Sequence, residues 1–185
     1  AAFALIAERS RLMGEAADGN PGVMSAFLKI TLAEAQELCA DCAEGEVLVP
    51  ANLNGGGQIV MAGTPAAVSR VEEAWAASKG RFSRLATSGG FHSPLMASAA
   101  EPFAAYLAGV DFRESAVPVI GNVHGAPLEV ATVREELVAH LVSPVQFEAS
   151  VQKLAAAGAQ MFAEVGFGGG LATLVERIDR AAPRG

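Results

Sequence analysis

The spacing of hydrophobic positions divides the first quarter of the chain into a helix, a strand and a second helix. Apolar residues recur at helical spacing from the first residue to about Ala17, where the turn signal DGNPG follows. The run VMSAFLKI then predicts a strand. Thr31 is a suitable N-cap for a helix that continues to about Ala43.

The next segment predicts a hairpin, a helix and a strand. EVLVPANL and GQIVMAG are apolar runs on either side of the turn at Gly55 to Gly57. Thr64 and Pro65 supply the N-cap and first position of a helix that continues to about Lys79, and RFSRLAT follows as a strand. Residues 20 to 87 therefore contain the order β-α-β-β-α-β, which predicts a ferredoxin-like subdomain.

The remainder of the chain predicts a different architecture. A helix is expected from about Pro94 to Ala108, followed by the strand VPVIGN and by helices over VREELVAHLV and PVQFEASVQKLAAAG. The strand QMFAEVG and the helix GGGLATLVERIDR complete the chain. Alternating strands and helices predict a parallel sheet with helices on its faces, so the fold class is α/β with an α+β insertion.

Composition narrows the class of protein. The chain has 185 residues, of which 51% are hydrophobic, and this is enough for one domain with a small insertion. A formal charge of -7 argues against nucleic acid as the main partner, because a protein that follows phosphates needs a basic surface. No apolar run is long enough to span a bilayer, so we expect a cytoplasmic protein.

The two cysteines do not predict a metal site. Cys39 and Cys42 form a C-x-x-C inside a helical pattern, and the sequence has no second pair of soft ligands. We interpret both as small helix residues without special chemistry.

His92 is the first candidate for chemistry. It lies in TSGGFHSPLM, in a glycine-rich turn before a helix, where Gly89 and Gly90 would let the backbone approach a substrate closely. A turn histidine bonded to a helix end is an equally good interpretation. A base needs a nucleophile, and no serine lies in a G-x-S-x-G elbow. Ser88 is the nearest approximation, but the predicted helix does not follow it directly.

Arg9 is the second candidate. Its neighbours at helical spacing are apolar, so its guanidinium leaves a face that is expected to be buried. A buried arginine without an acid is costly, which indicates a carboxylate ligand. The alternative is that its stem packs against the protein and its head reaches water.

Two other features are weaker candidates. The cluster EVGFGGGLATL has the strand-glycine-helix order of a phosphate site, but Leu171 replaces the last glycine of the dinucleotide fingerprint, and close packing is the better interpretation. His124 resembles a turn residue, and His140 lies near a helix C-terminus, where its charge is favoured.

These segments together resemble the malonyl-CoA:acyl-carrier-protein transacylase family and the related acyltransferase domains of polyketide and fatty acid synthases. The matching runs are ERSRLM, PANLNGGGQIVMAG, GGFHSPLM, VPVIGNVHG, LVSPVQF and FAEVGFGGGLATL, in this order along the chain. The resemblance implies a hydrolase-like parallel-sheet domain formed by residues 1 to 19 and 88 to 185. It also implies that residues 20 to 87 are its ferredoxin-like insertion.

The resemblance implies transfer of malonyl from malonyl-CoA to the phosphopantetheine thiol of an acyl carrier protein in fatty acid biosynthesis. His92 would be the catalytic base, oriented by the backbone carbonyl of His140, where the family commonly has glutamine. Arg9 would bind the malonyl carboxylate, and Met13 and Phe91 would line the pocket. No metal and no permanently bound cofactor are implied.

Departures from the family pattern leave alternatives open. Phe167 and Gly170 replace the commoner residues of the glycine cluster, and the family's nucleophile elbow is absent from the sequence. We therefore expect an incomplete carboxyl-terminal portion, inactive alone, whose serine lies upstream. Alternatives are a polyketide synthase acyltransferase domain, a thioesterase-like hydrolase, or a non-catalytic docking module for an acidic carrier protein. Local positive charge would suit docking, and it comes from Arg70, Lys79, Arg81 and Arg84.

Overall fold

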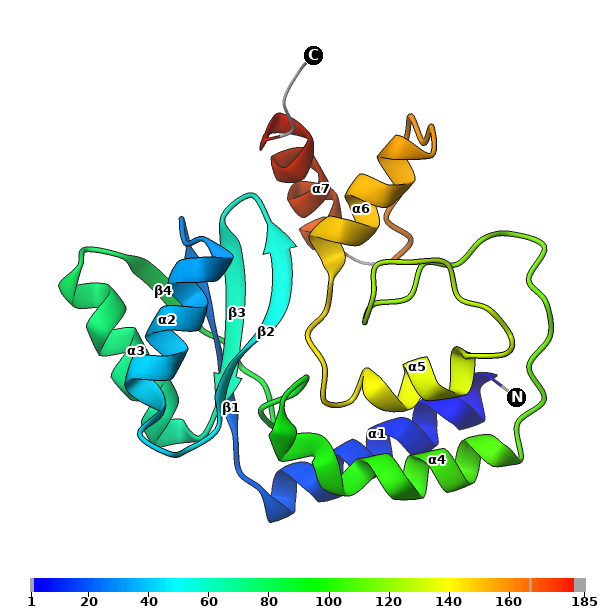
Figure 1. The fold of residues 1–185 in the computed structure, drawn as a ribbon, viewed down its shortest axis with the longest axis horizontal. Coiled ribbons are helices and arrows are strands. Elements are labelled where there is room, and N and C mark those ends of the chain that lie inside the picture. The colour runs from blue at the N-terminus through cyan, green and yellow to red at the C-terminus, as the bar shows by residue number, and fades with distance from the viewer. Residues whose placement is uncertain (1, 167, 182–185) are drawn as a thin grey trace.

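A small antiparallel sheet covered on one face by two helices forms the first part of the fold. The computed structural model describes residues 2 to 166 and 168 to 181. The four strands lie in the order β2-β3-β1-β4, and all their pairings are antiparallel. The elements are β1 (Val23–Leu28), α2 (Leu32–Ala43), β2 (Leu48–Gly55), β3 (Gln58–Gly63), α3 (Pro65–Ala77) and β4 (Arg81–Arg84). The predicted β-α-β-β-α-β order is confirmed, and α2 and α3 lie on the same face of the sheet (Figure 1).

Side chains of alternating strand positions separate the two faces of this sheet. Phe27 and Met61 point into the core shared with α2 and α3, which also contains Val68 of α3. Met24 and Val60 belong to a separate cluster on the opposite face. That second cluster contacts Leu85 and Phe91, so the uncovered face of the sheet leads to the segment that carries His92.

The predicted caps explain where the two helices of this part begin. Thr31 accepts a hydrogen bond from the amide of Glu34, and the Glu34 carboxylate accepts one from the Thr31 amide, which completes a capping box. The Thr64 hydroxyl accepts a hydrogen bond from the Ala67 amide, and Pro65 occupies the first turn of α3.

A second layer of helices lies below the sheet (Figure 1). Helix α1 runs beside α4, and α5 packs against α4. Their shared core includes Leu12, Met96, Phe103 and Leu141, all at most 4% exposed. The elements are α1 (Ala2–Gly19), the 3₁₀ helix η1 (Pro94–Ala99), α4 (Ala100–Ala108) and α5 (Val133–Ala139).

The last two helices, α6 (Phe147–Ala156) and α7 (Gly170–Ala181), lie beside the hairpin end of β2. The segment before α6 is hydrogen-bonded to β2. The amide of Leu53 donates to the carbonyl of Val145 at 2.9 Å, and the amide of Val145 donates to the carbonyl of Ala51 at 2.8 Å. Because this bridge is parallel, it joins the antiparallel sheet to the chain that follows α5.

Two predicted strands are wrong in the described part of the chain. Residues 117 to 122 make only the isolated bridge between Ile120 and Pro127, and residues 160 to 166 have no regular secondary structure. The described residues therefore form no parallel sheet. A strand requires a hydrogen-bonded neighbour, and these segments have none that would complete a ladder. Their apolar side chains stay exposed, including Val117 at 68% and Val165 at 97%.

From the sequence, the two cysteines are interpreted as small helix residues without special chemistry. Cys39 is buried with its thiol 3.7 Å from the Met61 sulfur, and both cysteines are free thiols. Within residues 2 to 166 and 168 to 181, no cluster of histidine, cysteine and carboxylate side chains could hold a metal ion. None of the helices described here combines the length and apolar character needed to cross a membrane.

Candidate active site

His92 has a backbone conformation that favours glycine. Its φ of 57° lies in the left-handed region, which costs a residue with a side chain about 1 kcal/mol or more. The turn is held by Ser93, whose buried hydroxyl donates to the Gly90 carbonyl at 2.5 Å and accepts from the Leu95 amide at 3.3 Å. Because the N-cap of η1 is the residue next to it, the start of that helix fixes the position of His92.

The glycines before His92 permit close packing within the protein. A Cβ on Gly90 would lie 2.9 Å from Leu95, and one on Gly89 would lie 2.8 Å from the Cβ of Ala17. A Cβ on Gly22 would lie 2.6 Å from the Gly90 amide nitrogen. The expectation that Gly89 and Gly90 admit a substrate is not supported by these contacts, which bring the turn against the end of α1 instead.

The His92 ring is oriented by the end of α5. Its Nδ1 lies 2.9 Å from the backbone carbonyl oxygen of His140, the residue that caps α5. A carbonyl only accepts hydrogen bonds, so neutral His92 carries its proton on Nδ1 and leaves the Nε2 lone pair free. This is the tautomer that a general base requires.

The surroundings of His92 keep it neutral. Burial lowers the pKa of His92, and the positive charge of Arg9 lowers it further. The hydrogen bond to the His140 carbonyl raises the pKa of His92, but burial is the largest effect. His92 is therefore uncharged and able to accept a proton at neutral pH.

Arg9 is a half-buried cation that has no partner among the described residues. Among the described side chains, none makes a hydrogen bond or ion pair with its guanidinium, whereas Arg11 on the same helix pairs with Glu8 at 2.6 Å and with Glu15 at 2.5 Å. Burial lowers the pKa of Arg9, although an arginine stays charged. The site thus contains a positive charge for which the described residues supply no acid.

Arg9 and His92 line the same cavity of about 530 Å³. Met13 and Phe91 also line it, so four residues singled out from the sequence meet at one place. The backbone carbonyl of His140 is hydrogen-bonded to the ring of His92. The sequence did not single out the polar residues Ser10, Asn52 and Thr87, which also line the cavity, and Ser88 joins them. Asn52 comes from an irregular register of β2, a feature that periodicity does not reveal.

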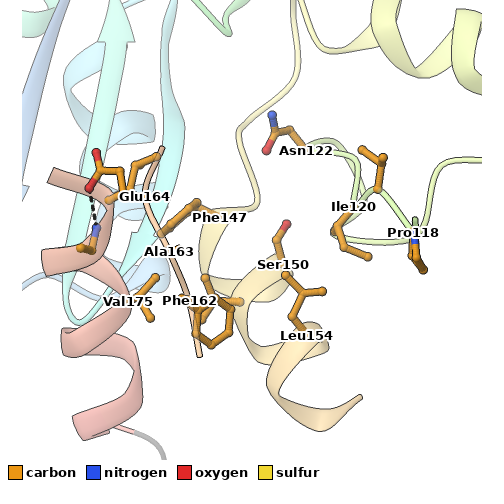
Figure 2. A pocket seen from close by; sticks show the side chains of 14 residues that line it. Pro118, Ile120, Asn122, Phe147, Ser150, Leu154, Phe162, Ala163, Glu164 and Val175 are labelled. Carbon is orange, nitrogen blue, oxygen red and sulfur yellow. Dashed lines mark hydrogen bonds between the residues drawn. The ribbon is translucent and has the colours of Figure 1, made fainter. Parts of the chain in front are cut away.

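A second cavity, of about 440 Å³, lies between α6, α7 and the two segments that were expected to be strands (Figure 2). Its walls are mainly apolar, with Phe147, Leu154 and Phe162 among them. Its one carboxylate, Glu164, accepts a hydrogen bond from the Ala172 amide at 3.0 Å near the start of α7. Among the described residues that line this cavity there is no histidine and no cation, so we place the chemistry in the cavity of His92.

Other candidates from the sequence have structural roles. Arg70 donates to the carbonyls of Cys42 and Ala43 at the end of α2, and Arg84 pairs with the buried Glu72 at 2.5 Å. Two of the four positive side chains that were expected to suit docking, Arg70 and Arg84, therefore bind groups of the protein itself. His124 is 74% exposed and lies 3.7 Å from a Glu136 oxygen.

The glycine cluster begins α7. Gly170 is its first residue, and a Cβ there would meet no atom within 4 Å. The cluster therefore shows no close packing at Gly170, contrary to our interpretation, whereas Phe167 lies outside the described residues.

Comparisons with known proteins show the family of the chain. The family model for the acyl transferase domain matches residues 1–181. The malonyl CoA-acyl carrier protein transacylase of Bacillus subtilis is 39% identical over 180 residues, covering 95% of this chain and 56% of the relative. The enzyme of the same name from Salmonella typhimurium is 38% identical over 179 residues, covering 96% of this chain and 58% of the relative.

Solved structures give the same picture. The malonyl-CoA:acyl carrier protein transacylase of Xanthomonas oryzae has a TM-score of 0.91 and 38% identity, covering 96% of this chain and 57% of that one. A malonyl-transacylase solved with a type II polyketide synthase acyl carrier protein has a TM-score of 0.92 and 31% identity, covering 97% of this chain and 59% of that one. The chain spans less than three fifths of the length of these relatives. With a matching family model over nearly all of its residues, the chain belongs to the acyl transferase domain family.

Proposed function

We propose that the protein transfers a malonyl group from malonyl-CoA to the phosphopantetheine thiol of an acyl carrier protein in fatty acid biosynthesis. The observation that carries this proposal is the shared cavity of Arg9 and His92, which combines a neutral base with a cation that pairs with no acid among the described residues. Relatives named malonyl CoA-acyl carrier protein transacylase support the choice of acyl group and acceptor. The activity needs no permanently bound cofactor.

The reaction would proceed in two matching halves. Nε2 of His92 takes the proton of a serine hydroxyl, whose oxygen attacks the malonyl thioester carbon. The carbon-sulfur bond breaks, and the proton passes from His92 to the leaving thiolate of CoA. In the second half His92 takes the proton of the carrier thiol, and the sulfur attacks the carbonyl carbon of the acyl-serine. The carbon-oxygen bond to serine breaks, and the serine oxygen recovers its proton from His92.

Each residue of the cavity has a role in this scheme. Arg9 binds the free malonyl carboxylate, for which a planar guanidinium is suited. Met13 and Phe91 form apolar walls, and the ring of Phe91 leaves little room for a branched acyl chain. The His140 carbonyl holds His92 in the required tautomer. The attacking serine lies outside residues 1 to 185 in this proposal.

The proposed architecture follows from the same resemblance. Residues 20 to 87 are a ferredoxin-like insertion subdomain, and residues 1 to 19 and 88 to 185 are a hydrolase-like acyltransferase domain. The free thiols of both cysteines are compatible with a cytoplasmic enzyme.

Transfer to a carrier protein of a polyketide synthase is a second candidate. It is favoured by the solved relative whose partner is a type II polyketide synthase acyl carrier protein. Rates with carrier proteins of the two pathways, measured side by side, distinguish these candidates.

Replacing Arg9 tests the carboxylate role. In a natural form of the protein that carries the nucleophile, Arg9→Ala should abolish malonyl transfer but retain or improve acetyl transfer, because acetyl has no free carboxylate. Equal losses for both acyl groups would contradict the proposal. His92→Ala should prevent formation of the acyl-serine, which intact mass measures.

The serines of this cavity require a control. Residues 1 to 185 incubated with malonyl-CoA should gain no malonyl mass. If mass is gained and Ser88→Ala removes it, the chain supplies its own nucleophile and the proposed external serine is wrong.

A further inference from the structure

The His140 side chain, as well as its carbonyl, lies against the proposed base. The centroids of the His92 and His140 rings are 4.6 Å apart, and the ring planes are inclined by 35°. The Nδ1 of His92 is at the same time held at 2.9 Å by the backbone of His140. His140 therefore contacts His92 both through its backbone carbonyl and through its ring. A substitution of the His140 side chain would remove only the ring contact.

The His140 ring is buried where a charge would be unfavourable. Its Nε2 is buried and has no hydrogen-bond partner among the described residues. Burial, together with the smaller effects of the positive charges of His92 and Arg9, lowers the pKa of His140 to about 4. His140 is thus neutral whenever His92 is ready to act, and it adds an uncharged aromatic surface to the site.

The charged groups around His92 and His140 do not offset the lowering of their pKa values. Arg9 of α1 is the cation that acts on both rings. On α5 the nearest acid at helical spacing is Glu136, whose carboxylate instead accepts from the Val123 amide at 2.9 Å and lies near His124. On the packed helix α4 the acid Glu101 is exposed. No carboxylate contributes to the pKa of either ring.

We propose that the His140 side chain is a positioning residue whose neutral ring shields His92 from water and so keeps the base unprotonated. The backbone carbonyl alone favours the protonated form of His92, because it accepts from the ring. The ring above it opposes that effect by excluding water from the charged form. The proposal rests on His92 as the base, but its test reads proton affinity directly and does not depend on transfer activity.

NMR titration of the histidine rings tests the shielding. The chain has only three histidines, and His124→Asn assigns the exposed one and should leave the other two unchanged. His140→Ala keeps the carbonyl but removes the ring, so the pKa of His92 should rise by about half a unit or more. His140→Phe keeps an uncharged ring and should leave the pKa of His92 near its wild-type value.

The result that overturns the proposal is equally direct. An unchanged pKa of His92 in His140→Ala, or an equal rise in His140→Phe, would remove the shielding role.

A reciprocal measurement needs no change at His140. His92→Asn should raise the pKa of His140, because the variant loses the positive charge that His92 carries once it is protonated. If the pKa of His140 stays the same in that variant, the two rings are not coupled and the proposal fails. In every variant that retains His92, its Nδ1 should remain protonated in the neutral form, as nitrogen chemical shifts report.

Discussion

Replacing Arg9 by methionine separates the effect of Arg9 on the stability of the fold from its effect on ligand binding. Methionine keeps a long apolar side chain but removes a half-buried charge that has no acid among the described side chains. Such a charge contributes no stability, so Arg9→Met should leave the free energy of unfolding unchanged or raise it by up to about 1 kcal/mol. Urea unfolding monitored by circular dichroism measures this value.

Arg11 provides a matched control on the same helix. Its two ion pairs, to Glu8 and Glu15, are on the surface, where such pairs stabilise a helix slightly. Arg11→Met should therefore lower the free energy of unfolding slightly. The two substitutions remove the same charge from the same helix, but the expected changes in stability differ in sign.

Ligand-induced stabilisation should show the reverse pattern. If malonyl-CoA binds as proposed, a concentration of 100 times its dissociation constant should stabilise the protein by about 2.7 kcal/mol, or roughly 5 to 10 °C in melting temperature for a chain of this size. A hydrogen bond to a charged group contributes about 1.5 to 3 kcal/mol, so Arg9→Met should weaken binding roughly 10- to 100-fold. At the same ligand concentration only about 0.4 to 1.4 kcal/mol of stabilisation then remains.

The assay compares malonyl-CoA with acetyl-CoA by thermal unfolding of the wild type and both variants. Arg11→Met should keep the full difference between the two ligands, whereas Arg9→Met should lose most of it. The reasoning would be refuted if Arg9→Met were as destabilised as Arg11→Met and still distinguished malonyl-CoA from acetyl-CoA.

Three other predictions concern the framework of the site. Gly22→Ala should cost about 2 kcal/mol or more in urea unfolding, because the new Cβ would lie 2.6 Å from the Gly90 amide, whereas Gly19→Ala, with nothing within 4 Å, should change little. The pKa of His140, about 4, lies below its ordinary value of 6.5, so the unfolded state binds this proton more readily and stability falls as pH falls from 6.5 to 4. His140→Gln should reduce that loss by roughly 2 kcal/mol, and unchanged acid unfolding would contradict this assignment. Burial raises the pKa of Cys39 to about 12, so a thiol reagent at pH 8 should label it in unfolded protein but hardly in native protein.

Local patterns predicted the elements of residues 23 to 84 because their signals are contained in short segments. Thr31 and Thr64 begin α2 and α3 through hydrogen bonds to residues three positions later, and the hairpin turn is marked by its glycines. Such contacts depend little on the rest of the fold.

The segments 117 to 122 and 160 to 166 show the limit of those patterns. Each is a short, mainly apolar run of the length of a strand, but a strand is defined by its hydrogen bonds to a neighbouring strand. Composition indicates that a segment can pair, whereas only the arrangement of the whole fold decides whether it does.

The site was predicted only as a set of residues. The residue pattern singled out His92 and Arg9, and the family resemblance added Met13 and Phe91. The structure places all four around one cavity. The left-handed backbone of His92 and its ring contact with His140 had no local signal, because the two residues are 48 positions apart and meet through tertiary packing.

The bridge at Val145 links the orientation of the base to the antiparallel sheet. Val145 is bonded to β2 on both sides of Asn52, and it lies five residues after His140, whose carbonyl holds the base. Asn52 itself lines the cavity with His92. A shift of β2 would therefore move one wall of the cavity and, through the short segment after α5, the group that fixes the tautomer of His92. The small sheet carries no proposed catalytic residue, but the geometry of the base depends on it.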